Sequence, residues 1–104
     1  MQKQREHELM DDIRLALSQR GFAVFRANVG TLKQGDRYIS TGLPKGFSDL
    51  FAVRDGKVYF IECKVKPNKP SAAQEYFLRN MRTRYGAAAG VAYSVEEALS
   101  ICGE

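Results

Sequence analysis

The sequence is poor in the side chains that bind zinc or cross-link chains, with two cysteines and one histidine among its 104 residues. Cys63 and Cys102 are far apart in the sequence and form no Cys-x-x-Cys pair, and His7 is near neither of them. A zinc site needs a cluster of such ligands, and a disulfide framework needs more than two cysteines. We therefore expect no zinc, and we expect both cysteines to be reduced in or near the core.

Long apolar runs are also missing. No apolar stretch approaches the roughly 20 residues that a membrane-spanning helix needs. The charged first six residues lack the apolar core of a secretory signal. We therefore expect a cytoplasmic protein with no membrane partner, and its length predicts a single domain, residues 1–104.

Acidic residues are outnumbered by basic ones. Sixteen lysines and arginines against twelve acidic residues give a net charge of +4, and the pI is about 9.2. A basic surface attracts phosphates and releases counterions when it binds them. The balance favours a polyanionic partner, although many soluble enzymes are mildly basic for no functional reason.

Hydrophobic spacing predicts a helix at the start of the chain, followed by strands. Apolar residues recur at three- and four-residue spacing over residues 6–20, which is typical of a helix with one buried face, and Gly21 ends it. Apolar runs predict three strands, at residues 22–27, 48–53 and 57–65. The Asp55-Gly56 pair indicates a hairpin between the last two. Residues 28–46 are predicted to be a loop, with room for a short strand at residues 37–39.

The rest of the chain alternates helix and strand. Ser71 is predicted to cap a helix that stops at Gly86 and turns four residues inward, namely Phe77, Leu78, Met81 and Tyr85. A strand over residues 88–93 follows, and the capping-box pattern Ser94-x-x-Glu97 opens a short last helix. A strand–helix–strand step implies a parallel crossover. Together with the hairpin it predicts an α/β fold, a mixed β-sheet flanked by helices in the order αβββαβα.

Two carboxylates and a lysine are predicted to converge at one end of this sheet. Strand alternation puts Glu62 and Lys64 on one face, and the hairpin places Asp49 opposite a position close to Glu62. Carboxylate oxygens are ligands that Mg²⁺ prefers. A bound Mg²⁺ polarises a phosphoryl oxygen and activates a water, and a lysine can orient that water or offset charge on the phosphate.

An ordinary explanation competes with this one. Glu62 and Lys64 would then form a solvated ion pair, which contributes about 0–1 kcal/mol to stability. Residue types alone favour that explanation. Val58 and Phe60, however, make the same face of the strand apolar, and charges that enter a covered face need a compensating role.

The order of these residues resembles a known nuclease signature. Gly46-Phe47-Ser48-Asp49, followed by Glu62-Cys63-Lys64, is similar to the PD-(D/E)xK signature, with Ser48 in place of its proline. More narrowly, the chain resembles the VRR-NUC family, the virus-type replication and repair nuclease domain. The further matches are a glutamate in the first helix, Arg26-Ala27-Asn28-Val29-Gly30 and Ser71-x-x-Gln74-x-x-Phe77. The resemblance covers nearly the whole chain and implies a restriction-endonuclease-like fold.

The resemblance also implies a role for each residue of the central motif. Asp49, Glu62 and the backbone carbonyl of Cys63 would bind Mg²⁺, or Mn²⁺ in its place, and Lys64 would position the attacking water. The Cys63 side chain is expected to be a buried packing residue rather than a nucleophile.

Two outlying members of the pattern have competing explanations. The N-terminal acid would bind a metal-bound water or a second ion. Glu6 is the first choice because it continues the apolar face of the helix, and Glu8 is the runner-up; either would otherwise be a solvated acid in the first turn. Gln74 would belong to the active site, but in Ser71-x-x-Gln74 it equally closes a capping box.

Five basic residues on loops near the motif are candidates for nucleic-acid binding, namely Lys33, Arg37, Lys45, Lys66 and Lys69. Individually each is also explained as a solvated charge, whereas together they suit contacts with a phosphate backbone. A domain of this size has little surface for an inserted recognition helix, so we expect recognition of DNA shape.

The resemblance implies a Mg²⁺-dependent, structure-specific DNA endonuclease that leaves a 5′-phosphate and a 3′-hydroxyl. Branched DNA such as a Holliday junction is the expected substrate, cut by a homodimer because two strands must be cleaved symmetrically. The family points to DNA repair and to a phage or bacterial host cytoplasm. The alternatives are a flap or single-strand nuclease, a non-catalytic DNA-binding module with a nuclease fold, and a small stress or assembly protein. The intact trio argues against the non-catalytic module.

Overall fold

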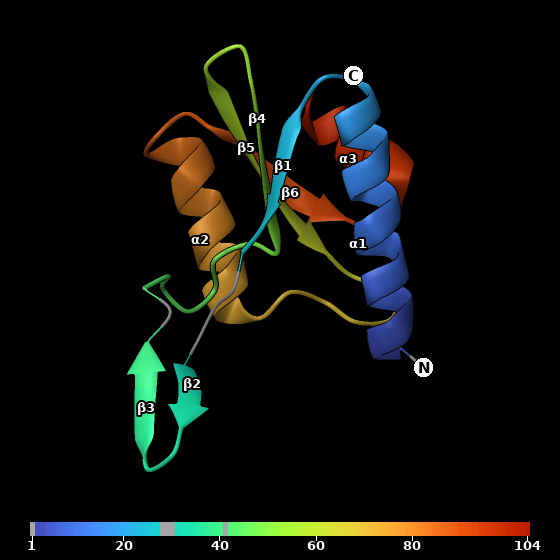
Figure 1. Ribbon diagram of the computed structural model, residues 1–104. Helices are drawn as coiled ribbons and strands as arrows, with labels where there is room; N and C mark the ends of the chain where they lie inside the picture. The colour runs from blue at the N-terminus through green and yellow to red at the C-terminus, as the bar shows by residue number, and fades with distance from the viewer. Residues whose placement is uncertain (1, 28–30, 41) are drawn as a thin grey trace.

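The computed structural model describes residues 2–27, 31–40 and 42–104 (Figure 1). Its elements, in chain order, are α1 (Gln2–Gln19), β1 (Ala23–Arg26), β2 (Thr31–Gln34), β3 (Arg37–Ser40), β4 (Leu50–Arg54), β5 (Lys57–Cys63), α2 (Ala72–Thr83), β6 (Ala88–Ala92) and α3 (Val95–Ile101). No helix in these ranges is long and apolar enough to cross a membrane.

Four strands form one mixed sheet in the order β1-β4-β5-β6. The pairs β1–β4 and β4–β5 are antiparallel, whereas β5 and β6 are parallel and joined through α2. Asp55 and Gly56 form the β4–β5 turn with φ of 54° and 77°. Positive φ at both central residues is what a type I′ hairpin turn requires. The predicted hairpin and the predicted parallel crossover are therefore both confirmed.

Helices cover both faces of this sheet, α1 and α3 on one side and α2 on the other (Figure 1). Side chains of β5 alternate between the two layers. Ile61 and Cys63 belong to the core beneath α1 and α3, while Phe60 packs edge to face against Phe77 beneath α2. Glu62 contacts α2 as well, through Gln74. The alternation predicted for this strand is thus confirmed, and it leaves a carboxylate between the sheet and α2.

A second, two-stranded sheet is inserted into the predicted order. β2 and β3 pair with each other in a sheet of their own, and the hairpin projects from the body (Figure 1). The short strand predicted at residues 37–39 exists as β3, but β2 was predicted to be loop, which is wrong. The missed signal is Gly35-Asp36 between two four-residue strands, with φ of +62° at Gly35. Glycine at the first central position is typical of a type II′ hairpin turn.

Several boundaries differ from the prediction. α1 begins at Gln2 rather than at residue 6, and β5 ends at Cys63 rather than at residue 65. The prediction that Tyr85 points inward is wrong, because α2 ends at Thr83 and Tyr85 lies beyond its cap, 66% exposed. Both cysteines are free and buried, as predicted.

The capping box predicted for α3 is only half formed. The Ser94 hydroxyl accepts from the Glu97 N–H at 3.1 Å. The Glu97 carboxylate, however, accepts from the N–H of Tyr93 rather than from that of Ser94. The Asn28, Val29 and Gly30 part of the predicted Arg26–Gly30 motif lies outside the described residues.

Candidate active site

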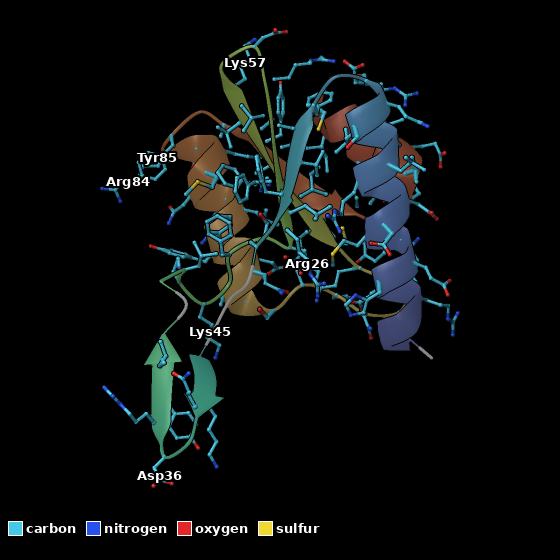
Figure 2. All side chains as sticks on the ribbon, viewed as in Figure 1. Arg26, Asp36, Lys45, Lys57, Arg84 and Tyr85 are labelled. Atoms are coloured by element: carbon cyan, nitrogen blue, oxygen red, sulfur yellow. The ribbon has the colours of Figure 1, made fainter. Side chains whose placement is uncertain are left out.

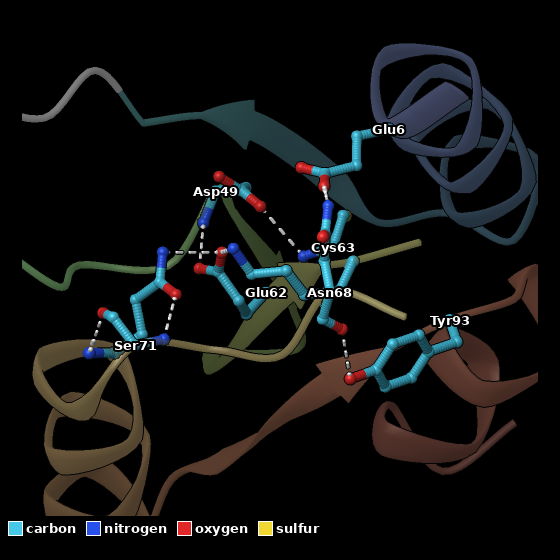
Figure 3. A network of polar contacts seen from close by, with 9 residues as sticks. Glu6, Asp49, Glu62, Cys63, Asn68, Ser71 and Tyr93 are labelled. Atoms are coloured by element: carbon cyan, nitrogen blue, oxygen red, sulfur yellow. Dashed lines mark hydrogen bonds and ion pairs between the residues drawn. The ribbon is translucent and has the colours of Figure 1, made fainter. Parts of the chain in front are cut away.

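Asp49 and Glu62 are brought together by the register of the β4–β5 hairpin. Leu50 pairs with Ile61, so the next position outward sets Asp49 opposite Glu62. The Asp49 N–H donates to Glu62 Oε1 at 3.2 Å, and the Cys63 N–H donates to Asp49 Oδ2 at 2.9 Å (Figure 3). Each carboxylate is therefore held by the backbone of the other strand.

Glu62 is an acid in a place that disfavours its charge. Its side chain is 1% exposed. Burial first, and then repulsion from the Asp49 carboxylate, raise the pKa of Glu62 to about 8, although Lys64 acts in the opposite direction. A carboxyl group with this pKa keeps its proton at neutral pH, even though Lys64 is close by. Lys64 therefore does not fully offset the repulsion between the Asp49 and Glu62 carboxylates, and a further cation would stabilise the ionised pair.

Lys64 supplies positive charge from the end of β5. The backbone N–H of Lys64 donates to the Ala92 carbonyl of β6 at 3.1 Å, which fixes the backbone just beyond the strand. Its ammonium nitrogen lies 3.6 Å from Glu62 Oε2, with 16% of the side chain exposed. The predicted same-face pair of Glu62 and Lys64 is therefore present, and Lys64 keeps a route to solvent.

Gln74 makes both of the contacts that the sequence left as alternatives. Its Oε1 accepts from the Ser71 N–H at 2.8 Å, and the Ser71 hydroxyl accepts from the Gln74 N–H at 3.2 Å, which completes the capping box. The Gln74 amide nitrogen meanwhile donates to Glu62 Oε2 at 3.0 Å. One amide thus caps α2 and holds Glu62.

Gly46 sets the distance between the Asp49 segment and α2. Its φ is +92°, and an added Cβ would collide with the backbone carbonyl of Ala73. Ala73 precedes Gln74 in the first turn of the helix. The glycine of the Gly46-x-x-Asp49 pattern therefore has a steric reason, since only a residue without a side chain permits this close approach.

Glu6 approaches the site from α1 through a loop residue. The Asn68 side-chain amide donates to Glu6 Oε2 at 3.0 Å, and the Tyr93 hydroxyl donates to the Asn68 carbonyl at 3.0 Å. Glu6 is half-buried, whereas Glu8, two residues on, is exposed. The geometry therefore brings Glu6 rather than Glu8 toward the site. Asn68 and Tyr93 were not predicted; they lie in an aperiodic loop and at a strand end, where spacing carries no signal.

Cys63 lies among three acids. Burial raises the pKa of its thiol, and the charges of Asp49, Glu62 and Glu6 raise it further. A thiol in such surroundings stays protonated and is a poor nucleophile. The Cys63 backbone carbonyl is better placed than the thiol to bind a metal ion, because the N–H and C=O of one strand residue point the same way. The Cys63 carbonyl therefore faces the side on which Asp49 accepts its N–H.

The donor set fits a hard divalent cation. Within the described ranges, no group of three or more histidine, cysteine, aspartate or glutamate side chains is gathered closely enough to hold a metal ion. Glu6 accordingly stands apart from the Asp49–Glu62 pair. Mg²⁺ is commonly bound by one or two carboxylates, with waters and substrate phosphates completing its shell. Two carboxylates that repel each other, beside a backbone carbonyl, match that requirement.

The predicted basic residues fall into two groups. Lys66 and Lys69 are exposed on the loop that carries Asn68, the residue that contacts Glu6, and Lys66 lies over the Tyr93 ring. Lys33 and Arg37 are exposed on the β2–β3 hairpin, and Lys45 is exposed near its base (Figure 2). The first group shares a loop with Asn68, the partner of Glu6, whereas the second belongs to the hairpin and its base.

Comparison with solved structures finds a chain described as a VRR_NUC domain, with a TM-score of 0.66 and 21% sequence identity over 95% of each chain. The protein has the VRR_NUC fold. The resemblance drawn from the sequence motifs is thereby confirmed for the fold, including the mixed sheet with flanking helices. No protein-family model matches the sequence, and no curated protein matches it. Within the VRR_NUC fold, the Asp49–Glu62 pair lies at the sheet end that faces the first turn of α2.

Proposed function

We propose that the protein is a metal-dependent nuclease that hydrolyses phosphodiester bonds of DNA. The observation that carries this proposal is the Asp49–Glu62 pair, two hydrogen-bonded carboxylates of which one is buried with a raised pKa. Perturbed acids of this kind concentrate at functional sites. The VRR_NUC fold supports the nuclease class, and the net charge of +4 suits a phosphate-rich substrate.

Asp49, Glu62 and the Cys63 carbonyl would hold Mg²⁺, or Mn²⁺ in its place. When bound, such an ion polarises a phosphoryl oxygen and lowers the pKa of a water. Gln74 keeps one oxygen of Glu62 oriented through its amide, while the Asp49 N–H holds the other. The first steps of catalysis, binding and orientation, thus rest on side chains already fixed by hydrogen bonds.

Lys64 and Glu6 complete the proposed machinery. The Lys64 ammonium orients the attacking water and offsets charge that develops on the phosphate. Its 3.6 Å separation from Glu62 leaves it free to turn toward a substrate. Glu6, held by Asn68 and apart from the Asp49–Glu62 pair, would bind a metal-bound water or a second ion.

We propose branched DNA, such as a four-way junction, as the substrate and a homodimer as the active form. Symmetric cleavage of two strands needs two sites related by a twofold axis. Lys33, Arg37, Lys45, Lys66 and Lys69 would contact the phosphate backbone, which positions DNA without reading its sequence.

The test is cleavage of labelled duplex, flap and four-way junction DNA with Mg²⁺, Mn²⁺ or chelator. We expect cutting only with a divalent ion, and loss of cutting with retained binding in Asp49→Asn, Glu62→Gln and Lys64→Ala. Asp12→Asn is the matched control, since Asp12 is an exposed acid of α1. Full cutting by Asp49→Asn would exclude this mechanism. Binding without cutting by the wild-type protein would favour a DNA-binding module.

A further inference from the structure

The β2–β3 hairpin, residues 31–40, is a basic arm without a covering layer. It forms its own two-stranded sheet and projects away from the four-stranded sheet and its helices (Figure 1). Residues 33–39 are all exposed, Tyr38 by 70% and Ile39 by 46%. An isolated two-stranded hairpin is only marginally stable in water. The arm is therefore expected to gain order from a partner.

Cationic side chains stand on both faces of the arm. The register pairs Lys33 with Tyr38 and Gln34 with Arg37. Directly paired residues share a face and neighbouring residues alternate, so Lys33 and Arg37 point in opposite directions. A flat partner would meet one of these charges and leave the other in solvent. A partner with anionic walls on two sides would meet both.

The major groove of DNA has such walls. It is about 12 Å wide, lined on each side by phosphates, and admits a two-stranded β-ribbon. Four-residue strands reach roughly 13 Å at about 3.3 Å per residue. The arm's only acid, Asp36, lies at its tip (Figure 2). Tip-first entry takes this carboxylate past the phosphates to the groove floor, where amino groups of cytosine and adenine are donors.

We propose that the arm enters the major groove of a duplex segment next to the site, with Lys33 and Arg37 on its opposite phosphate walls. The proposal rests on the proposed DNA nuclease function and adds a substrate class, DNA with a duplex beside the scissile phosphate. Lys45, exposed near the base of the arm, extends the positive surface toward the body (Figure 2).

The test is binding to a 20-base-pair duplex and to a single strand of equal length, in chelator and across salt concentrations. We expect Lys33→Ala and Arg37→Ala each to weaken duplex binding roughly threefold to tenfold and to lower the salt slope by about 1. Their effects should multiply in the double variant, because the residues contact different walls. Gln34→Ala is the control within the arm, and single-strand binding should change less in every variant.

Two results would overturn this proposal. One is an unchanged affinity and salt slope for the duplex in the double variant. The other is dissociation of a wild-type dimer to monomers by Tyr38→Ser and Ile39→Ser in sedimentation, which would assign the arm to a second copy of the chain rather than to DNA. Cleavage separates the two hypotheses. A wild type that cuts no DNA contradicts the nuclease proposal, whereas equal cutting of junctions by wild type and arm variants contradicts the arm and the phosphate contacts of Lys33 and Arg37 but leaves the nuclease proposal standing.

Discussion

Replacing Asp49 by asparagine should make the metal-free protein more stable above about pH 8, where Glu62 is ionised, and should abolish the proposed nuclease activity. Asparagine retains an oxygen that can accept from the Cys63 N–H, as Asp49 does at 2.9 Å. It removes the charge that repels Glu62, and its amide can donate to that carboxylate. The substitution therefore relieves an electrostatic conflict without opening a cavity.

The size of the gain follows from the pKa of Glu62. The folded protein raises it from 4.5 to about 8, a difference of 3.5 (8 − 4.5), which corresponds to roughly 5 kcal/mol at 1.36 kcal/mol per pKa unit. Burial is the larger cause, and burial remains in the variant. We assign Asp49 the smaller part, about 1–2 kcal/mol, which raises the melting temperature by roughly 5–15 °C in a domain of this size.

The sign of the pH dependence is fixed by the same values. Because the folded pKa of Glu62 exceeds the unfolded one, the folded protein keeps a proton that the unfolded chain has lost. The wild type is therefore destabilised progressively as pH rises from about 4.5 to about 8. In Asp49→Asn the pKa of Glu62 is lower, so this loss is smaller. The two proteins should converge near pH 5 and differ most above pH 8.

The assay is urea and thermal unfolding in chelator at pH 5, 7 and 8.5, with Asp12→Asn as a control for removing an exposed acid. Added Mg²⁺ should stabilise the wild type, by about 2.7 kcal/mol at a hundredfold excess over its dissociation constant, and leave Asp49→Asn unchanged. The order of stability then reverses. The reasoning is refuted if Asp49→Asn is no more stable than the wild type at pH 8.5 in chelator.

Three further substitutions test residues that hold the side chains of the site in position. Gly46→Ala should lower the free energy of unfolding by more than about 2 kcal/mol in urea unfolding, because it combines a positive φ with a collision against Ala73. Gln74→Ala should cost about 1–2 kcal/mol in the same assay and weaken Mg²⁺ binding measured by calorimetry, since one amide serves the cap and Glu62. Tyr93→Phe should cost about 1 kcal/mol and lower Mn²⁺-dependent activity more than Phe22→Leu, a core change of the same order that leaves Asn68 untouched.

The central pair was predictable because two local signals fix it. Asp55-Gly56 defines the turn, and strand alternation then determines which residues of β4 and β5 face each other. From that register alone, Asp49 falls opposite Glu62, as the structure has it. The choice of Glu6 over Glu8 was also accessible, because a helix with one buried face places only one of two residues at i and i+2 near the core.

The contacts of Asn68 and the strand β2 were not predicted from the sequence, because both lie in segments without a regular hydrophobic pattern. Asn68 lies in a loop between two prolines, where no periodicity tells which way a side chain points. Its contacts run to Glu6, 62 positions away, and to Tyr93, 25 positions away. The prediction missed β2 for another reason. Residues Thr31–Gln34 include one apolar side chain, so the pattern of a buried strand is absent. A hairpin that faces a polar partner, as we propose for this one, needs no such pattern.

The role of Gln74 shows why two explanations of one residue need not exclude each other. A capping box uses the side-chain oxygen as an acceptor, and the amide nitrogen is then left with donors to spare. In this fold those donors point to Glu62. A glutamate at position 74 would cap the helix equally well, yet it would add a third negative charge beside Asp49 and Glu62. The site therefore selects the amide over the acid at a position where helix capping alone accepts either.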